Sequence, residues 1–375
     1  MGAFFFFLAI GALAGAPLMG AWLAGRPLET FLVLPPMTTS IYLEKAPFSW
    51  PAFFIIAALV LLVMVPFILR VLNSQKVVQQ LPKAGRNFPW WGWLGLAIML
   101  AGWIAAWTRI PWLAPVQTFT FTPPWIGFII LVNAITFMRT GKSLITHRPV
   151  YLVSMFVFSA VFWWYFEYLN LLVENWFYVN VGVYNPVRFF WYATLPFSTV
   201  LPAVISTTYL IESYPRLTTG LQNFLTIRPA KPAVFIWVSL AAGTAGMVLI
   251  SFFPDYLFPF LWFAPTAIIG SLMALRGNTE LFTPLASGNW VRLYSLALAA
   301  LVCGFFWEMW NYHSLTKWVY SIPLVHRFLI FEMPVLGYAG YLPFGLQCGL
   351  AASLLNHLYQ KIKGAYKAPS AKCSF

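Results

Sequence analysis

The sequence predicts an all-α, polytopic membrane protein, and its composition together with the length of its apolar segments carries that prediction. Of its 375 residues, 61% are hydrophobic and only 8% are charged. A soluble chain of this length could not bury so much apolar surface, so much of it must be solvated by lipid. The aromatic content of 19% fits side chains gathered at the two interfaces of a membrane.

About ten apolar segments are long enough to cross a bilayer as helices of roughly 20 residues each. They are residues 4–24, 52–72, 90–108, 124–140, 150–172, 191–213, 233–253, 256–275, 293–313 and 334–358. The seventh and eighth are divided only by the short polar break Pro254–Tyr256. No Lys or Arg precedes Phe4, so the first segment lacks the basic start of a signal peptide and is predicted to be a membrane helix.

The basic residues predict the orientation of these helices. The chain carries 22 Lys and Arg against 9 Asp and Glu, a net charge of +13. Of the 22, 16 fall on the side of the predicted bundle that also holds both termini. Cytoplasmic loops are enriched in Lys and Arg, so both termini are predicted to be cytoplasmic. This distribution argues against a nucleic-acid partner and predicts a multi-pass protein of a bacterial inner (cytoplasmic) membrane, in contact with membrane lipids.

Two short segments of the sequence are nearly alike and lie 141 residues apart. Residues 166–170 and residues 307–311 share the pattern Glu-x-x-Asn among bulky apolar residues. The same offset relates Leu201–Pro202 to Leu342–Pro343. A charged residue kept at one place in both copies of a repeat, near the end of an apolar segment, is a functional-site candidate.

The internal repeat divides the chain into five parts. Residues 90–213 and 235–358 each contain four predicted spans, and an even number gives the two copies the same orientation. The pseudo-two-fold axis of such a parallel repeat runs along the membrane normal. Residues 1–89 contain a hairpin of two further spans and a basic cytoplasmic loop. Residues 214–234 form a cytoplasmic linker, and residues 359–375 form a basic cytoplasmic tail.

Candidate ligand-binding residues gather at the extracytoplasmic end of the predicted bundle. Glu167 and Asn170 are three residues apart, so they share one helix face, and so do Glu308 and Asn311. Each pair lies close to the outer end of its span. A carboxylate is costly inside an apolar segment, which favours a functional role for the two glutamates.

Further polar and aromatic candidates follow in the second copy. Glu332 lies just before the last span, and Tyr338 and Tyr341 follow it among glycines that allow an irregular backbone. Pro343 is predicted to break the hydrogen-bond ladder of the last helix. Gln347 adds a polar group one turn deeper.

These residues suit an amphiphilic ligand. We expect its polar head to contact Glu308, Asn311 and Glu332, and its apolar body to lie on the surrounding Trp and Tyr side chains. The sequence therefore predicts an integral membrane subunit that binds a quinol-like or lipid-like molecule at the extracytoplasmic side of a larger complex. The redox centres would then belong to a periplasmic or membrane partner subunit.

Three other interpretations remain open. One is a secondary transporter with a site between the two repeats, although few polar residues lie near the bilayer midplane. Another is a membrane-embedded enzyme of isoprenoid or lipid chemistry, with Glu308 or Glu332 as a general acid. In a purely structural interpretation, an outer glutamate pairs with Lys317, Arg188 or Arg327 and fixes the fold.

The histidines and cysteines limit the cofactors. His147 and His357 are predicted on the cytoplasmic side, and His313 and His326 on the outer side. No haem is expected, because a haem within the membrane needs two histidines facing each other in the core. The three cysteines show neither a disulfide framework nor zinc spacing, so no metal site and no covalently bound cofactor are predicted.

A motif set near the C-terminus resembles that of bacterial multispanning membrane proteins of unassigned function. The segments that carry the resemblance are Trp307–Tyr312, Lys317–Tyr320, Phe331–Pro334 and Gly340–Phe344. Such proteins often have Glu where this chain has Gln347, so a charged role for that position is not implied here. The paired four-helix bundles are also similar in architecture to membrane subunits of quinone-linked respiratory complexes, without matching residues.

Overall fold

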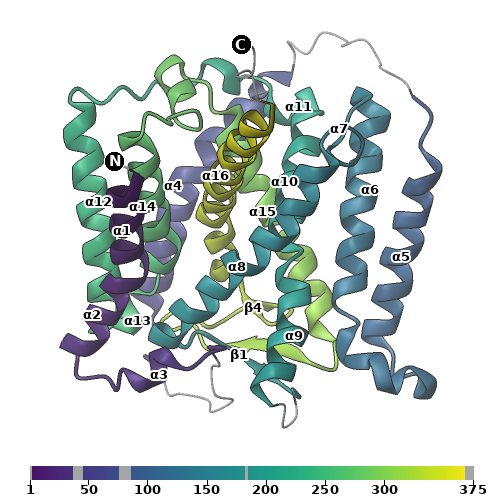
Figure 1. Cartoon of the computed structure of the whole chain (residues 1–375), viewed down its shortest axis with the longest axis horizontal. Helices are drawn as coiled ribbons and strands as arrows, with labels where there is room; N and C mark the ends of the chain where they lie inside the picture. Colours follow the sequence, from purple (N-terminus) through teal and green to yellow (C-terminus); the bar gives the residue numbers. More distant parts are fainter. Residues whose placement is uncertain (1, 37–44, 76–85, 182–184, 368–375) are drawn as a thin grey trace, which may run out of the picture.

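The computed structural model describes residues 2–36, 45–75, 86–181 and 185–367 of the chain. Within these residues helices dominate, and the strands form two short two-stranded ribbons. Long helices run roughly parallel through one bundle (Figure 1). The prediction of an all-α, multi-pass membrane protein is confirmed at this level.

The helices of the first half follow the predicted apolar segments. They are α1 (Gly2–Ile10), the π-helical turn η1 (Gly11–Gly15), α2 (Ala16–Leu23), α3 (Glu29–Leu32), α4 (Trp50–Asn73), α5 (Trp90–Trp107), the 3-10 helix η3 (Pro111–Phe119), α6 (Thr122–Thr140), α7 (Leu144–His147), α8 (Pro149–Val173), α9 (Pro186–Phe197), α10 (Val200–Glu212), α11 (Pro215–Thr218) and the 3-10 turn η4 (Leu221–Asn223). The strand β1 (Trp176–Val179) follows α8.

The second half contains a similar order of elements. Its helices are α12 (Pro232–Leu249), α13 (Pro254–Leu257), α14 (Phe260–Leu275), the 3-10 helix η5 (Thr283–Ser287), α15 (Val291–Tyr312), the 3-10 helix η6 (Val335–Gly340) and α16 (Tyr341–Lys367). The strands β2 (Lys317–Tyr320), β3 (Leu329–Ile330) and β4 (Met333–Pro334) lie between α15 and η6.

Six of the described helical segments, with α9 and α10 counted together as residues 186–212, are long and apolar enough to cross a membrane. The number becomes seven if η3 and α6, which meet at an angle of 69°, are counted as one span. Residues 7–23 and 260–275 are shorter apolar helices. Helix is present in each of the ten predicted ranges, but length and composition alone support six or seven spans, so the count of ten stays a prediction.

The two ends of the bundle differ in what they hold. The start of α1 and the end of α16 lie at one end, which we call the terminal end (Figure 1). The ribbons, α3 and α13 lie at the opposite end, which we call the strand end. Glu167 and Glu308, near the ends of α8 and α15, therefore belong to the strand end.

The helices of the two halves pack in corresponding pairs. α5 packs on α6 as α12 packs on α14, and α6 packs on α10 as α14 packs on α16. α10 also packs against α15, across the centre of the bundle. Gly345 permits the close approach of α16 to α15, because a Cβ there would lie 2.2 Å from the Leu296 carbonyl oxygen.

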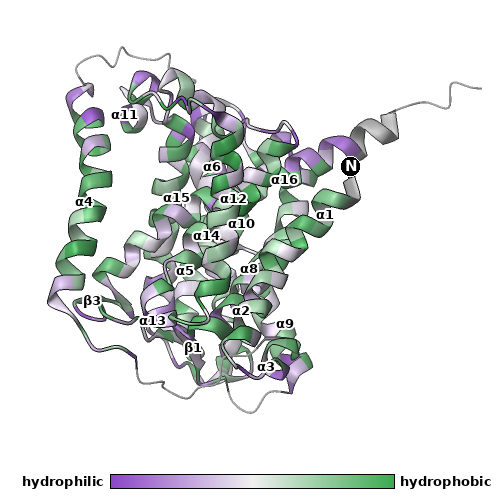
Figure 2. Cartoon of the chain, turned by 90° about the vertical axis from the view of Figure 1, so that its left-hand side faces the viewer, coloured by the Kyte–Doolittle hydropathy of each residue, from purple (hydrophilic) through white to green (hydrophobic). Residues whose placement is uncertain are grey.

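The first two predicted spans do not form a hairpin. α2 packs on α12, whereas α4 stands on the opposite side of the bundle (Figure 2). No residue in the most apolar stretch of α4 is buried. α4 is held near its two ends, where Ser49 N donates to Leu324 O at 2.9 Å and Arg70 Nε donates to Gly220 O at 2.9 Å. The described contacts do not pair the two spans as the expected hairpin, since α2 packs on α12 whereas α4 contacts η6, η4 and α11.

The prolines of the repeat start helices and do not interrupt them. Pro343 is the third residue of α16 and Pro202 is the third residue of α10. A proline in the first turn of a helix costs little, because N–H groups there have no intrahelical acceptor. The predicted break at Pro343 is therefore replaced by a helix start, and the irregular backbone precedes it in η6.

The predicted span 191–213 is divided between α9 and α10. Ser159 of α8 lies at the division and satisfies backbone groups on both sides of it. Its Oγ donates to Phe197 O at 2.7 Å and accepts from Leu201 N at 3.0 Å. A buried hydroxyl thus replaces the hydrogen bonds that the helix lacks at its interruption.

Candidate functional site

A two-stranded ribbon joins the two halves at the strand end. β1 follows α8, β2 follows α15, and the two strands pair antiparallel. Trp176 lies opposite Tyr320, and Tyr178 lies opposite Trp318. Each half therefore contributes one Trp and one Tyr in reciprocal positions of the ladder.

Glu167 is a buried carboxylate held by aromatic donors. Its Oε1 accepts hydrogen bonds from Trp163 Nε1 at 3.0 Å, Trp176 Nε1 at 3.1 Å and Tyr178 OH at 2.7 Å. The residue is 2% exposed. Trp163 lies one turn earlier on α8, whereas the other two donors come from β1.

Glu308 has a similar environment in the second half. Its Oε1 accepts from Tyr320 OH and Tyr341 OH, each at 2.7 Å, and Trp318 Nε1 donates to the Tyr320 oxygen at 2.8 Å. The residue is 0% exposed, and its Oε2 has no hydrogen-bond partner among the described residues. A buried carboxylate oxygen without a partner is a candidate contact for a ligand.

Asn170 and Asn311 fix the strands to the helices that precede them. Asn170 Nδ2 donates to Trp176 O at 2.7 Å, and its Oδ1 accepts from Asn175 N at 2.9 Å. Asn311 Nδ2 donates to Trp318 O at 2.7 Å, and its Oδ1 accepts from Trp318 N at 2.9 Å. These bonds set the position of each strand relative to its glutamate. Direct contact of the two amides with a ligand stays a prediction.

Glu332 forms an ion pair, and the two repeat glutamates do not. Lys317 Nζ contacts Glu332 Oε1 and donates to Tyr312 O at 3.2 Å. Among the described residues, Glu167 and Glu308 pair with no basic side chain. The structural interpretation, a glutamate paired with Lys317, therefore describes Glu332.

Tyr338 and Gln347 donate to backbone carbonyls and not to the glutamates. Tyr338 OH donates to Ile330 O at 3.1 Å. Gln347 Nε2 donates to Trp262 O at 2.7 Å and to Leu261 O at 3.4 Å. Pro265 has no N–H for the Leu261 carbonyl four residues before it, so Gln347 compensates a proline within α14.

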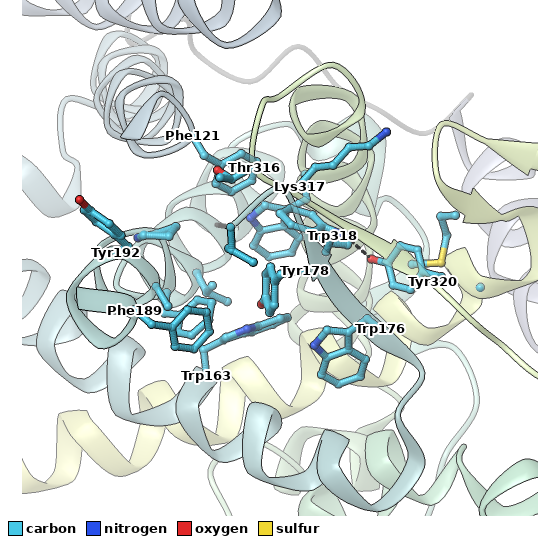
Figure 3. A pocket seen from close by; sticks show the side chains of 18 of the residues that line it. Phe121, Trp163, Trp176, Tyr178, Phe189, Tyr192, Thr316, Lys317, Trp318 and Tyr320 are labelled. Carbon is cyan, nitrogen blue, oxygen red and sulfur yellow. Dashed lines mark hydrogen bonds between the residues drawn. The ribbon is translucent and has the colours of Figure 1, made fainter. Parts of the chain in front are cut away.

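An aromatic cavity of about 150 Å³ lies beside the ribbon. The side chains that hold the glutamates form part of its wall, and Figure 3 shows Trp163, Trp176, Tyr178 and Trp318 around its interior. The lining rings contact one another: the ring centroids of Trp163 and Trp307 are 6.4 Å apart. We call this space the aromatic cavity; its other aromatic lining residues include Trp262, Tyr320 and Tyr341.

A larger apolar groove of about 650 Å³ lies between α4 and the second half. Aliphatic side chains of α4, among them Val60 and Val63, form one wall, and residues of α14, α15 and α16 form the other. We call this space the α4 groove. It shares six lining residues with the aromatic cavity: Trp176, Trp262, Tyr320, Met333, Gly337 and Gly340.

The strand tyrosines are fixed as hydrogen-bond donors. Burial, together with the neighbouring Glu167, raises the pKa of Tyr178 well above its ordinary value. Burial and Glu308 act in the same way on the pKa of Tyr320. Both phenols therefore stay protonated at any physiological pH, and each O–H donates a hydrogen bond to a carboxylate.

Sequence reasoning placed Glu308, Asn311 and Tyr341 in one site, and the structure brings them together. It missed Tyr178, which donates to Glu167, and Trp262, which lines both spaces. The signal for Tyr178 is present in the sequence: Trp176 and Tyr178 precede Trp318 and Tyr320 by 142 residues, close to the offset of the repeat.

The described residues contain no group of three or more His, Cys, Asp or Glu arranged to hold a metal ion. Comparisons with family models, with curated proteins and with solved structures find no match for the chain. The resemblance to bacterial multispanning proteins therefore stays a prediction.

Proposed function

We propose that this membrane protein binds a quinol-like or lipid-like amphiphile at the strand end of the bundle. The polar head lies in the aromatic cavity and the apolar tail lies in the α4 groove. The shared wall of the two spaces is the observation that carries this proposal, because one molecule with a head and a tail can occupy both.

The groove suits an apolar tail. Its walls are aliphatic and aromatic side chains of helices that face lipid, including Leu59 and Val63, which are largely exposed. Its volume of about 650 Å³ falls in the range of pockets that hold small molecules, roughly 300–1,000 Å³. A tail can enter sideways from the bilayer, because α4 is held near its ends and not along its length.

The cavity suits a compact head. Its volume of about 150 Å³ matches that of an engineered protein cavity known to hold a benzene-sized molecule. Aromatic side chains form much of its wall, and the nearby Oε2 of Glu308 has no hydrogen-bond partner among the described residues. A ring or another rounded group of that size is the head that this wall accommodates.

We further propose ten spans, arranged as two parallel four-helix repeats with both termini in the cytoplasm of a bacterium. The matching pair contacts of the two halves and the reciprocal ribbon support this arrangement. Cysteine labelling in intact cells tests it: a membrane-impermeant maleimide should label Glu29→Cys at the strand end and spare Ser287→Cys at the terminal end. The reverse pattern would reject the orientation.

Mass spectrometry of lipids that co-purify with the protein in nanodiscs tests the amphiphile. Val60→Trp fills the α4 groove and should remove the retained molecule. Leu62→Trp is the matched control, because Leu62 lies two residues away on the same helix, is 71% exposed and does not line the groove. Equal retention by both variants would reject the groove as the tail site, and no retained molecule in the wild type would reject the amphiphile.

A further inference from the structure

We infer that the head group of the amphiphile is an organic cation of the quaternary ammonium class. This inference rests on the proposed function and narrows it. Three features of the aromatic cavity point to it: the ring faces of its wall, the carboxylates behind that wall and the orientation of the nearby lysine.

The wall of the cavity is a cage of electron-rich rings. Five tryptophans line it, namely Trp163, Trp176, Trp262, Trp307 and Trp318, together with tyrosines from both halves. The face of an indole carries partial negative charge and attracts a cation more strongly than other aromatic faces do. Cages of such rings are a recurrent means of binding quaternary ammonium groups, which cannot donate a hydrogen bond.

Two carboxylates lie directly behind this wall. Trp163, Trp176 and Tyr178 donate to Glu167, and Tyr320 donates to Glu308. All four of these donors also line the cavity. Each of these side chains therefore contacts both the cavity and a carboxylate, so the negative potential of the carboxylates extends into the cavity.

The lysine beside the cavity does not cancel this charge. Lys317 belongs to the lining, but its ammonium group is paired with Glu332 and donates to Tyr312 O. Figure 3 shows its side chain directed away from Tyr178 and the other rings. The charge of Lys317 is therefore balanced by Glu332, whereas Glu167 and Glu308, behind the wall, have no basic partner among the described residues.

An anionic head group finds few free donors in the same wall. Five of the lining donors already form hydrogen bonds to the glutamates. They are the phenol O–H groups of Tyr178, Tyr320 and Tyr341 and the indole N–H groups of Trp163 and Trp176. Phosphate and sulfate groups need several N–H or O–H donors, or an unpaired cation. A trimethylammonium group needs only ring faces and nearby negative charge.

The α4 groove distinguishes a ligand that carries an apolar tail from a small quaternary ammonium ion without one. Because the cavity shares its wall with the α4 groove, we assign the ligand as a quaternary ammonium amphiphile. A free quaternary ammonium solute would occupy the cavity alone and would gain nothing from the groove.

Calorimetric titration of the full chain in nanodiscs, with empty nanodiscs as the blank, tests this assignment. The probes are decyltrimethylammonium and its uncharged carbon isostere, in which a tert-butyl group replaces the trimethylammonium. We expect the cation to bind about tenfold more tightly than the isostere. Equal affinities would overturn the cationic head and leave the amphiphile proposal intact, and absence of saturable binding by either probe would overturn both.

Tetramethylammonium tests the tail separately. It should bind far more weakly than decyltrimethylammonium, and Val60→Trp should reduce only the binding of the longer probe. Affinity for tetramethylammonium equal to that of the longer probe would overturn the amphiphile assignment in favour of a free solute.

Variants of the cavity wall test the cage by the ratio of two affinities, which a general loss of folded protein would not change. Trp307→Leu removes a ring that lines the cavity without holding a glutamate, and it should lower the ratio of cation to isostere affinity about threefold. Trp307→Phe should retain part of that ratio. Trp237→Leu is the control, because Trp237 is 50% exposed on α12 and lies outside the cavity. An unchanged ratio in Trp307→Leu would contradict the cage.

Discussion

Gly304 lies against the ring of Tyr341, so closely that a Cβ at this position would fall 2.4 Å from two of the ring carbons. The offset of 141 residues pairs Gly304 with Trp163 and Tyr341 with Val200. The donor that comes from a helix is Trp163 of α8 in the first half and Tyr341 of α16 in the second, whereas the other donors come from the strands. The large and the small side chain have therefore exchanged helices between the halves, while the hydrogen bond to the carboxylate is kept.

Gly304→Ala should destabilise the protein, because the added methyl group meets the ring of Tyr341. Overpacking of this kind costs about 1–3 kcal/mol. Thermal unfolding in detergent, followed by near-ultraviolet circular dichroism, measures the loss. Gly11→Ala is the control, since a Cβ at Gly11 meets nothing within 4 Å, and equal effects of the two substitutions would contradict the contact.

The arrangement of the first half should be transferable to the second. Gly304→Trp alone should prevent stable folding, because the indole and the ring of Tyr341 claim the same space. Combined with Tyr341→Val, it should recover most of the stability, since the new indole can donate to Glu308 as Trp163 donates to Glu167. A double variant no more stable than Gly304→Trp would show that the halves differ too much in backbone for this exchange.

Glu308→Gln and Glu308→Leu should differ clearly in stability. The amide oxygen of glutamine still accepts from Tyr320 and Tyr341, whereas leucine leaves two buried phenols without an acceptor. Each unsatisfied buried group costs about 1–3 kcal/mol, so the leucine variant should unfold at a distinctly lower temperature. Similar unfolding temperatures for both variants would mean that the phenols find other partners.

Ligand binding by a Glu167→Gln variant should show whether the negative charge of this residue or only its hydrogen-bond acceptor matters. Glu167→Gln preserves the acceptor for Trp163, Trp176 and Tyr178 but removes the negative charge behind the cage. We expect decyltrimethylammonium to bind about threefold more weakly while the uncharged isostere is unaffected. Calorimetry of the two probes measures the ratio, and an equal loss for both would assign Glu167 to the architecture of the cavity alone.

Acidification should destabilise the strand end through His326. Burial lowers the pKa of His326 from its ordinary value of 6.5, and Glu332 opposes this shift only in part. The unfolded chain then binds more protons than the folded one, so stability falls as the pH drops below 6.5. Protonation also removes the acceptor Nδ1, which receives Ile322 N at 3.4 Å. Unfolding temperatures at about pH 5 and about pH 8 should differ less in His326→Phe than in the wild type.

The sequence predicted the features that depend on local chemistry. Membrane helices, two glutamates near helix ends and the proximity of Glu308 to Tyr341 all follow from hydropathy and spacing. The strands were not predicted, because Trp176 and Tyr320 form a ladder only through a partner 144 residues away. The role of Gln347 was equally hidden, since it depends on Pro265 of a neighbouring helix.

The ribbon has the pairing that a symmetric homodimer would produce. In an interface with two-fold symmetry, residue i of one subunit meets residue j of the other, and j meets i. Trp176 with Tyr320 and Trp318 with Tyr178 obey this rule within one chain. A single four-helix half that met a copy of itself would place each Trp opposite its partner's Tyr and would hold both carboxylates in the same way. Fusion of two such halves would allow them to diverge. The large ring lies on α8 in one half and on α16 in the other, and this difference requires two halves of different sequence, as in a fused chain.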